Sequence, residues 1–217
     1  MASTGYTFPG AAANYDIAGA TKQWTITTGP TLKDDLDATD GVDAIASAIG
    51  NTGGDSVRTD YLYVSTFGFS IPAGSTIDGI QIRCITKSNG AGQAAQINCA
   101  TNGHSIFIAG IPAGTIDTTD IWTSDDPTYT TFELGGATSL WGLTPTVSQI
   151  NASDFGIGIS AQNSASTPTA RIDSIEINIY YTTGLANLKT ANTITKANIK
   201  TRNTIAIASI KSWNTIT

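Results

Sequence analysis

The stretch Thr76-Ile-Asp-Gly-Ile-Gln-Ile-Arg-Cys-Ile-Thr86 alternates apolar and polar residues, which places Ile80, Ile82 and Cys84 on one face. A period of two is typical of a half-buried β-strand. A second run, from Ala170 to Tyr181, alternates in the same way after one slip in phase. Since a slip of one residue is what a β-bulge produces, we expect a bulge near residues 173–174. The two runs predict long strands.

Turn residues recur at short intervals along the rest of the chain, as in an all-β sandwich. The charged fraction is only 13%, and threonine and isoleucine fit a pleated surface better than a helix. We expect about eight to ten strands in an antiparallel β-sandwich over residues 1–183. Further strands are expected at 60–71 and 104–111, each ended by Pro-Ala-Gly, and at 129–134 and 155–161, with one helical turn within 146–153.

The net charge is -6 and the sequence pI is about 4.5, which argues against a general nucleic-acid-binding protein. No segment approaches the ~20 apolar residues of a membrane span. The first residues lack the basic and apolar regions of a signal peptide. We therefore expect synthesis in a cytoplasm, with export only as part of something larger.

Residues for catalysis are scarce. The only histidine, His104, lies in a stretch that indicates a turn, so we expect it at the surface. Glu133 and Glu176 are the only glutamates, and both lie in alternating runs where the default position faces solvent. No motif of a serine hydrolase, a nucleotide-binding loop or a zinc protease occurs. Aspartate pairs leave a carboxylate hydrolase open, but we expect no enzyme and no cofactor.

The densest acidic cluster is a weak candidate for calcium. Asp35, Asp37 and Asp40 could supply oxygen ligands, but the spacing does not follow the EF-hand loop. A solvated acidic loop is the alternative.

The two cysteines lie in alternating runs on either side of the glycine-rich segment 88–93, which favours a hairpin. If the hairpin is symmetric, Cys84 and Cys99 lie opposite each other. A disulfide is then one outcome, and a pair of reduced core thiols, as expected in a cytoplasm, is the other.

The same segments resemble virion structural proteins of tailed bacteriophages. The resemblance rests on residues 60–80, with Phe67-Gly-Phe-Ser-Ile-Pro-Ala-Gly, on 140–156, with Leu140-Trp-Gly-Leu-Thr, and on the closing strand 171–181. It implies a jelly-roll-like module used for capsid decoration, as a head fibre or as a tail component. It names no catalytic residues. Its implied partners are other virion proteins and copies of the chain, with a homotrimer as the expected oligomer.

The aromatic residues suggest a second hypothesis. Trp24, Trp122, Trp141 and the pair Tyr180-Tyr181 could form a platform for sugars if their rings are exposed. The protein would then be a glycan- or receptor-binding module of a phage fibre or adhesin, with a host glycan as partner. Packing in the core is the usual fate of such rings.

Residues 184–217 form a separate tail with an eleven-residue repeat in almost three copies, at 186–196, 197–207 and 208–217. An eleven-residue period also suits a right-handed helical supercoil, but the many Asn, Thr and Ile favour short β-strands. Three repeats are marginal alone, so we expect the tail to order against other subunits. The aligned residues are Leu188, Ile199 and Ile210, then Ile194, Ile205 and Ile216, and Lys189, Lys200 and Lys211, with Trp213 in the last copy.

The charge of the tail is opposite to that of the body. Residues 184–217 contain five basic residues and no acidic one, so the rest carries six basic and 17 acidic residues, a net charge of -11. Complementary charges steer association, so the tail is expected to dock on an acidic neighbour. Contact with packaged nucleic acid is a weaker alternative.

Overall fold

The computed structural model describes residues 1–26, 44–46, 57–89, 103–122, 128–163 and 169–184. The chain divides into two units, Met1–Thr183 and Gly184–Thr217. All strands of the described residues belong to the first unit, which we call the body. We call residues 184–217 the tail.

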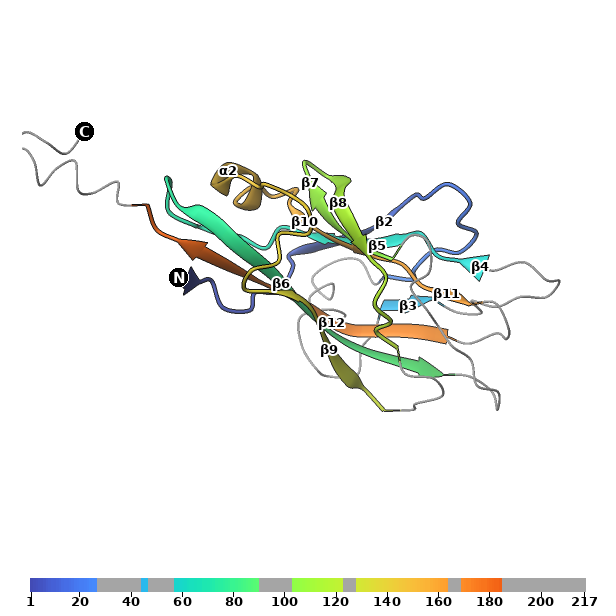
Figure 1. The fold of residues 1–217 in the computed structure, drawn as a ribbon. Helices are drawn as coiled ribbons and strands as arrows, with labels where there is room; N and C mark the ends of the chain where they lie inside the picture. The colour runs from blue at the N-terminus through green and yellow to red at the C-terminus, as the bar shows by residue number, and fades with distance from the viewer. Residues whose placement is uncertain (27–43, 47–56, 90–102, 123–127, 164–168, 185–217) are drawn as a thin grey trace, which may run out of the picture. The chain divides into compact units, whose positions relative to one another are not determined.

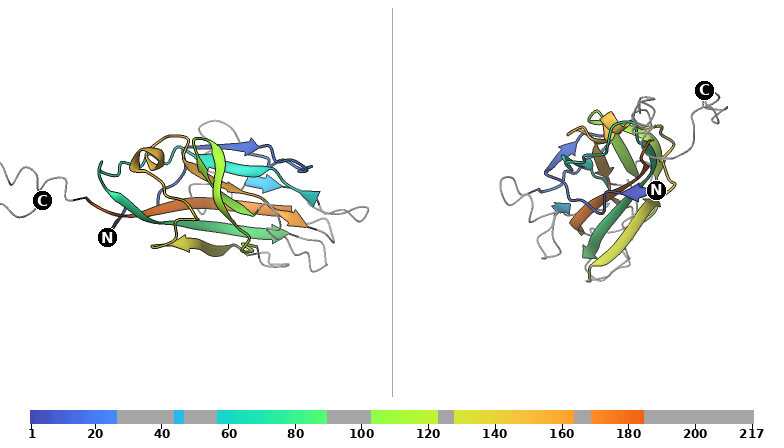
Figure 2. Two further views of the ribbon diagram at one scale, coloured as in Figure 1. Left: turned by 45° about the horizontal axis from the view of Figure 1, so that its top comes forward. Right: turned by 90° about the vertical axis from the view of Figure 1, so that its left-hand side faces the viewer.

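The body is an all-β protein of antiparallel sheets, as predicted, and its two main sheets face each other (Figures 1 and 2). The first, here the β6–β12 sheet, has the order β1 (Ala2–Ser3), β12 (Thr169–Thr182), β6 (Thr76–Asn89), β9 (Thr130–Gly136), and β3 (Ala44–Ala46) also pairs with β12. The second, here the β5–β10 sheet, has the order β2 (Ala11–Tyr15), β5 (Tyr61–Ser65), β10 (Gly156–Ile159), β7 (His104–Ile108), β8 (Ile111–Asp117). The remaining elements are the pair β11 (Gln162–Asn163) and β4 (Val57–Arg58) and the short helix α2 (Val147–Ile150).

The core lies between the inner faces of the two sheets. Ile80, Ile82 and Cys84 are fully buried, which confirms the predicted face of β6. In the ladder they stand opposite three fully buried isoleucines of β12, at 179, 177 and 175. Burying one such side chain contributes about 1.5–3 kcal/mol, so this double row holds the two longest strands together.

Two local predictions are confirmed. The register between β12 and β6 shifts between Ile172 and Ser174, where the sequence predicted a bulge. The helical turn forms as α2, whose N-cap Thr146 and residue Gln149 make a reciprocal capping box. Such a box satisfies two backbone donors that a helix start leaves free, which explains how one turn of helix persists.

The glycines of β10 make room for aromatic rings on the outer face of the β5–β10 sheet. A Cβ at Gly158 would lie 2.4 Å from an atom of Phe107. Tyr63 stacks on Phe107, with ring centroids 4.4 Å apart, while Tyr15 and Tyr61 meet it edge-on. The Gly-Ile-Gly-Ile pattern therefore places isoleucine in the core and lets rings close over the opposite face.

The predicted long strand at 60–71 is wrong in length. β5 ends at Ser65, and Thr66 has a φ of 62°, a left-handed conformation that breaks the ladder. Phe67, Phe69 and Ile71 still alternate inward and are buried. The alternation thus reported burial correctly, although the backbone is not a strand there.

The predicted end of the next strand is also wrong. β7 stops at Ile108, and Ala109 and Gly110, both with positive φ, form a tight turn into β8. Positive φ at both central residues is the geometry of a two-residue hairpin. Pro112, expected to end a strand, lies inside β8, which is tolerated because β8 is at the edge of its sheet.

The predicted pairing of the two cysteines is wrong. Cys84 stands opposite Phe132 of β9 on one side and Ile175 of β12 on the other, so both ladder positions beside it are occupied. Its thiol is free and fully buried, and burial raises its pKa. Cys99 lies outside the described residues.

Candidate functional site

Two segments that carried the resemblance come together at one end of the body. The side chain of Asn151 makes both hydrogen bonds of a peptide group with Ile71: Nδ2 donates to the carbonyl at 2.9 Å, and Oδ1 accepts from the N–H at 3.0 Å. Thr66 N–H donates to the carbonyl of Ser153 at 3.0 Å. Residues 66–77 are thereby held against α2 and the loop that follows it.

Between these segments lies a groove of about 1000 Å³, at the upper end of the usual range for binding sites, about 300–1,000 Å³. We call it the end groove. No charged residue lines it, and the Oγ of Ser75 is buried without a hydrogen-bond partner among the described residues. Its apolar lining is Ile71, Ala73, Ile77, Leu140, Pro145, Val147 and Ala152, and its polar lining is Ser75, Thr76, Thr144, Thr146, Ser148 and Asn151.

The loop containing Trp141 joins the two sheets next to this groove. The indole Nε1 donates to the carbonyl of Ile80 in β6 at 3.1 Å, and the carbonyl of Trp141 accepts from Thr115 N–H in β8 at 2.7 Å. Gly114 makes this approach feasible, since its φ is 77° and a Cβ there would lie 2.3 Å from that carbonyl. The motif Leu140-Trp-Gly-Leu thus holds the two sheets in place around the groove.

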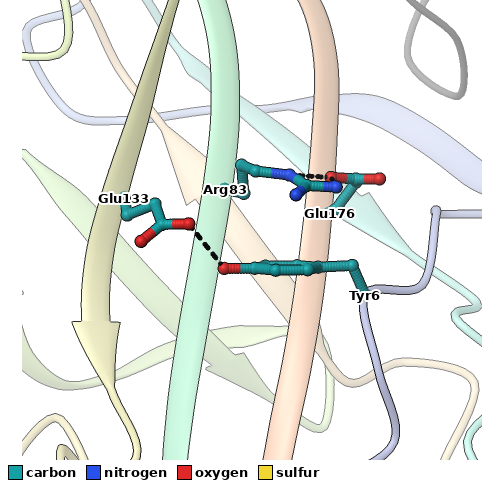
Figure 3. A network of polar contacts seen from close by, with 4 residues as sticks. All are labelled: Tyr6, Arg83, Glu133 and Glu176. Carbon is teal, nitrogen blue, oxygen red and sulfur yellow. Dashed lines mark hydrogen bonds and ion pairs between the residues drawn. The ribbon is translucent and has the colours of Figure 1, made fainter.

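The outer face of the β6–β12 sheet, which points away from the core, carries a polar network (Figure 3). Arg83 of β6 forms an ion pair with Glu176 of β12, whose side chain is only 7% exposed. The guanidinium lies over the ring of Tyr6, 3.9 Å from its centroid, and Tyr6 Oη donates to Glu133 of β9 at 2.9 Å. The bond to Glu176 raises the pKa of Arg83, and burial followed by the bond to Glu133 raises the pKa of Tyr6.

Tyr6 belongs to residues 1–8, which we call the N-terminal strap. The strap runs along the edge of β12 that β6 leaves open: β1 pairs with Tyr180 and Tyr181, and Thr7 exchanges two backbone hydrogen bonds with Ile177. The side chain of Tyr6 then crosses the sheet. The strap explains why Glu176, which the sequence placed in solvent, is buried at 5% exposure, while Glu133 is exposed as expected.

His104 is also buried, which contradicts the expected surface position. It is the first residue of β7, it is fully buried, and its Nε2 donates to the carbonyl of Thr119 at 3.0 Å. Burial lowers its pKa from 6.5 to about 4, although that bond and the charges of Asp117 and Asp120 act in the other direction. At neutral pH it is an uncharged part of the interior.

The tryptophans do not form the platform that a glycan site needs. Trp24, Trp122 and Trp141 are 3%, 5% and 6% exposed, and Trp24 stacks on Trp122. Tyr180 is partly buried and donates from Oη to Gln81. Core packing, the usual fate of such rings, is therefore confirmed for these three tryptophans, and the alternative of exposed rings at these positions is wrong.

Other predicted site residues lie outside the described ranges. They are the calcium candidates Asp35, Asp37 and Asp40 and every aligned residue of the tail, from Leu188 to Ile216. Within the described ranges, no group of three or more His, Cys, Asp or Glu side chains is placed to hold a metal ion. The helix described here is also too short to cross a membrane.

No protein-family model, curated protein or solved structure matches the chain. The end groove and the strapped face of β12 are therefore interpreted from their own chemistry. The sequence contained a signal for the groove, since both of its walls come from the quoted motifs. It gave none for the strap, because Tyr6 lies far from β6 and β9 in the chain.

Proposed function

We propose that the protein is a non-enzymatic structural protein of a virion that assembles through its C-terminal tail. The observation that carries this proposal is β12, the last strand of the described residues. It is paired with β6 along one edge and with β1, Thr7 and β3 along the other, and it runs directly into the basic repeat. A strand fixed on both edges is a firm attachment point for a segment that binds neighbours.

Three further features support the proposal. Three polar groups of the body serve its own fold, since Glu176 neutralises Arg83 and His104 is buried and uncharged. The body and tail have opposite net charges, -11 and +5, which favours association between copies or with an acidic partner. The resemblance to bacteriophage virion proteins agrees in the kind of role, with capsid decoration, a head fibre and a tail component all compatible.

The alternative, a glycan- or receptor-binding module, has lost its main candidate residues, because the three described tryptophans are buried. It now needs a different surface. Saturable binding to a glycan array would favour it over the structural role.

Truncation after Thr183 tests the structural role. The core and the hydrogen bonds of the body lie before this residue among the described residues, so we expect the truncated chain to keep its far-UV spectrum. Light scattering should show fewer or smaller oligomers than the full chain forms, and co-sedimentation with particles should be lost. Unchanged assembly would refute the role of the tail.

A further inference from the structure

Strand β12, which leads into the tail, ends beside the end groove. Thr182, the last residue of β12, stands opposite Thr76, the first residue of β6, in the ladder. Thr76 also lines the groove. Figure 1 shows the end of β12, the start of β6 and α2 toward the same end of the body. Strand β12 therefore ends next to this site, and 33 further residues follow Gly184 in the chain.

The groove suits a neutral, partly apolar segment of chain. Its lining combines aliphatic side chains with hydroxyl and amide groups, and no charged side chain lies in it. Small anions and cations would find no counter-charge there. An extended segment can place an aliphatic side chain against the aliphatic part of the lining while its backbone bonds to the hydroxyl and amide groups.

The tail has this composition at regular spacing. Each repeat contains a leucine or isoleucine after an Asn or Ser, and each contains Asn-Thr-Ile in its second half. Its five basic residues meet a body of net charge -11, which steers the encounter even though the groove itself is neutral.

Building on the proposed function, we propose that the end groove is the docking site for the C-terminal repeat of a neighbouring copy of this chain. One aliphatic residue of a repeat packs against the aliphatic lining, and its Asn and Thr neighbours bond to the hydroxyl and amide groups. The strand that leads into each tail ends next to the groove of its own copy, so the donating and accepting sites are adjacent. Assembly then brings together the same end of each copy.

Substitution of the groove wall in the full chain tests this inference. Ala73 is exposed in the turn Pro72–Ser75, closed by a 3.2 Å hydrogen bond, with Gly74 at a φ of 81°. Ala73→Arg puts bulk and positive charge at the groove. Ala18 provides a matched control, because it is exposed at the same position of a second turn, closed by Ala20 N–H to the Ile17 carbonyl at 2.9 Å, with Gly19 at 82°.

Light scattering across a concentration series gives the midpoint of assembly for each variant. Ala73→Arg should raise the midpoint by about tenfold or more, since it both blocks the site and repels a basic tail, whereas Ala18→Arg should stay within about twofold. Ser148→Arg, exposed on α2 at the opposite wall, gives a second reading that does not depend on the folding of the first variant. Excess synthetic peptide of residues 186–196 should compete and lower the oligomer fraction of the wild-type chain.

The outcomes separate the two proposals. Loss of assembly in both groove variants but not in Ala18→Arg supports docking in the groove. If both groove variants assemble like Ala18→Arg while the chain truncated after Thr183 does not, docking in the groove is refuted and the tail keeps its role. If the truncated chain assembles as well as the full chain, both proposals fail.

Discussion

Acid should destabilise the protein through one side chain, His104. Its pKa is 6.5 when unfolded and about 4 in the folded protein, so between these values the unfolded chain binds more protons. The contribution of neutral His104 to the free energy of unfolding is then fully present above pH 6.5 and is lost as the pH falls toward 4. One pKa unit corresponds to about 1.36 kcal/mol, so the full loss is roughly 3 kcal/mol, and about 2 kcal/mol of it is reached at pH 5.

The assay is urea unfolding at several pH values from 8 to 4, in wild type and in His104→Gln. His104 is the only histidine, so the two proteins differ in a single group that titrates in this pH range. Their carboxylates contribute alike to the pH dependence of both. The glutamine amide can still donate toward the Thr119 carbonyl, but it does not titrate. The free energy of unfolding of the variant should therefore depend less on pH, and the two curves should differ in slope by about 2 kcal/mol between pH 8 and pH 5.

Only the pH dependence of the free energy of unfolding is compared, because any substitution in the core also changes its absolute value. Parallel curves for the two proteins would refute the reasoning, because they would mean that His104 keeps its ordinary pKa. An NMR titration of the imidazole gives an independent reading: its signals should show no protonation midpoint near 6.5 in the folded protein.

Three further predictions concern stability, measured by denaturant unfolding. Gly114→Ala should destabilise by at least ~2 kcal/mol more than Gly68→Ala, because both have positive φ but only the first would place a Cβ 2.3 Å from a carbonyl oxygen; equal losses would show that the clash is relieved. Asn151→Ala should cost about 2–4 kcal/mol, since it leaves a backbone N–H and a carbonyl without partners; a loss below ~1 kcal/mol would contradict this role. In a double-mutant cycle, Arg83→Met and Glu176→Gln should show a coupling of about 1–3 kcal/mol, and additive effects would mean that the ion pair contributes nothing.

Alternation in the sequence predicted the interior well where strands are long. Ile80 and Ile82 point inward, and even the bulge after Ile172 follows from the position at which the phase slips. A period of two records which side chains are buried, and a half-buried sheet imposes that period strongly. The same signal misled at Phe67 and Phe69, since side chains can alternate inward without a paired backbone.

The sequence failed where the outcome depended on partners distant in the chain. The hairpin expected to join Cys84 and Cys99 needed a free edge of β6, but β9 and β12 occupy both edges. Glu176 reads as a solvent-facing residue until the strap covers it, and His104 reads as a turn residue until the strand it begins turns it inward. A sequence pattern reflects contacts between residues a few positions apart, whereas the burial of a polar group depends on elements many residues away.

The groove shows an intermediate case. Both motif segments were recognisable, but their contact depends on the amide of Asn151, which reproduces a backbone pair across 80 residues of chain. No periodicity encodes such a bond. The residues of the site were therefore identifiable from the sequence, and their meeting was not.

The double pairing of β12 has a mechanical consequence. If neighbouring subunits hold the tail and pull it along the axis of β12, the tension reaches the body at Thr182. Ladder hydrogen bonds lie perpendicular to the strands, so a pull of this direction loads the whole β6 ladder and the strap in shear, instead of opening one pair at a time. An assembly built from such subunits should therefore release its contacts between copies before any subunit unravels.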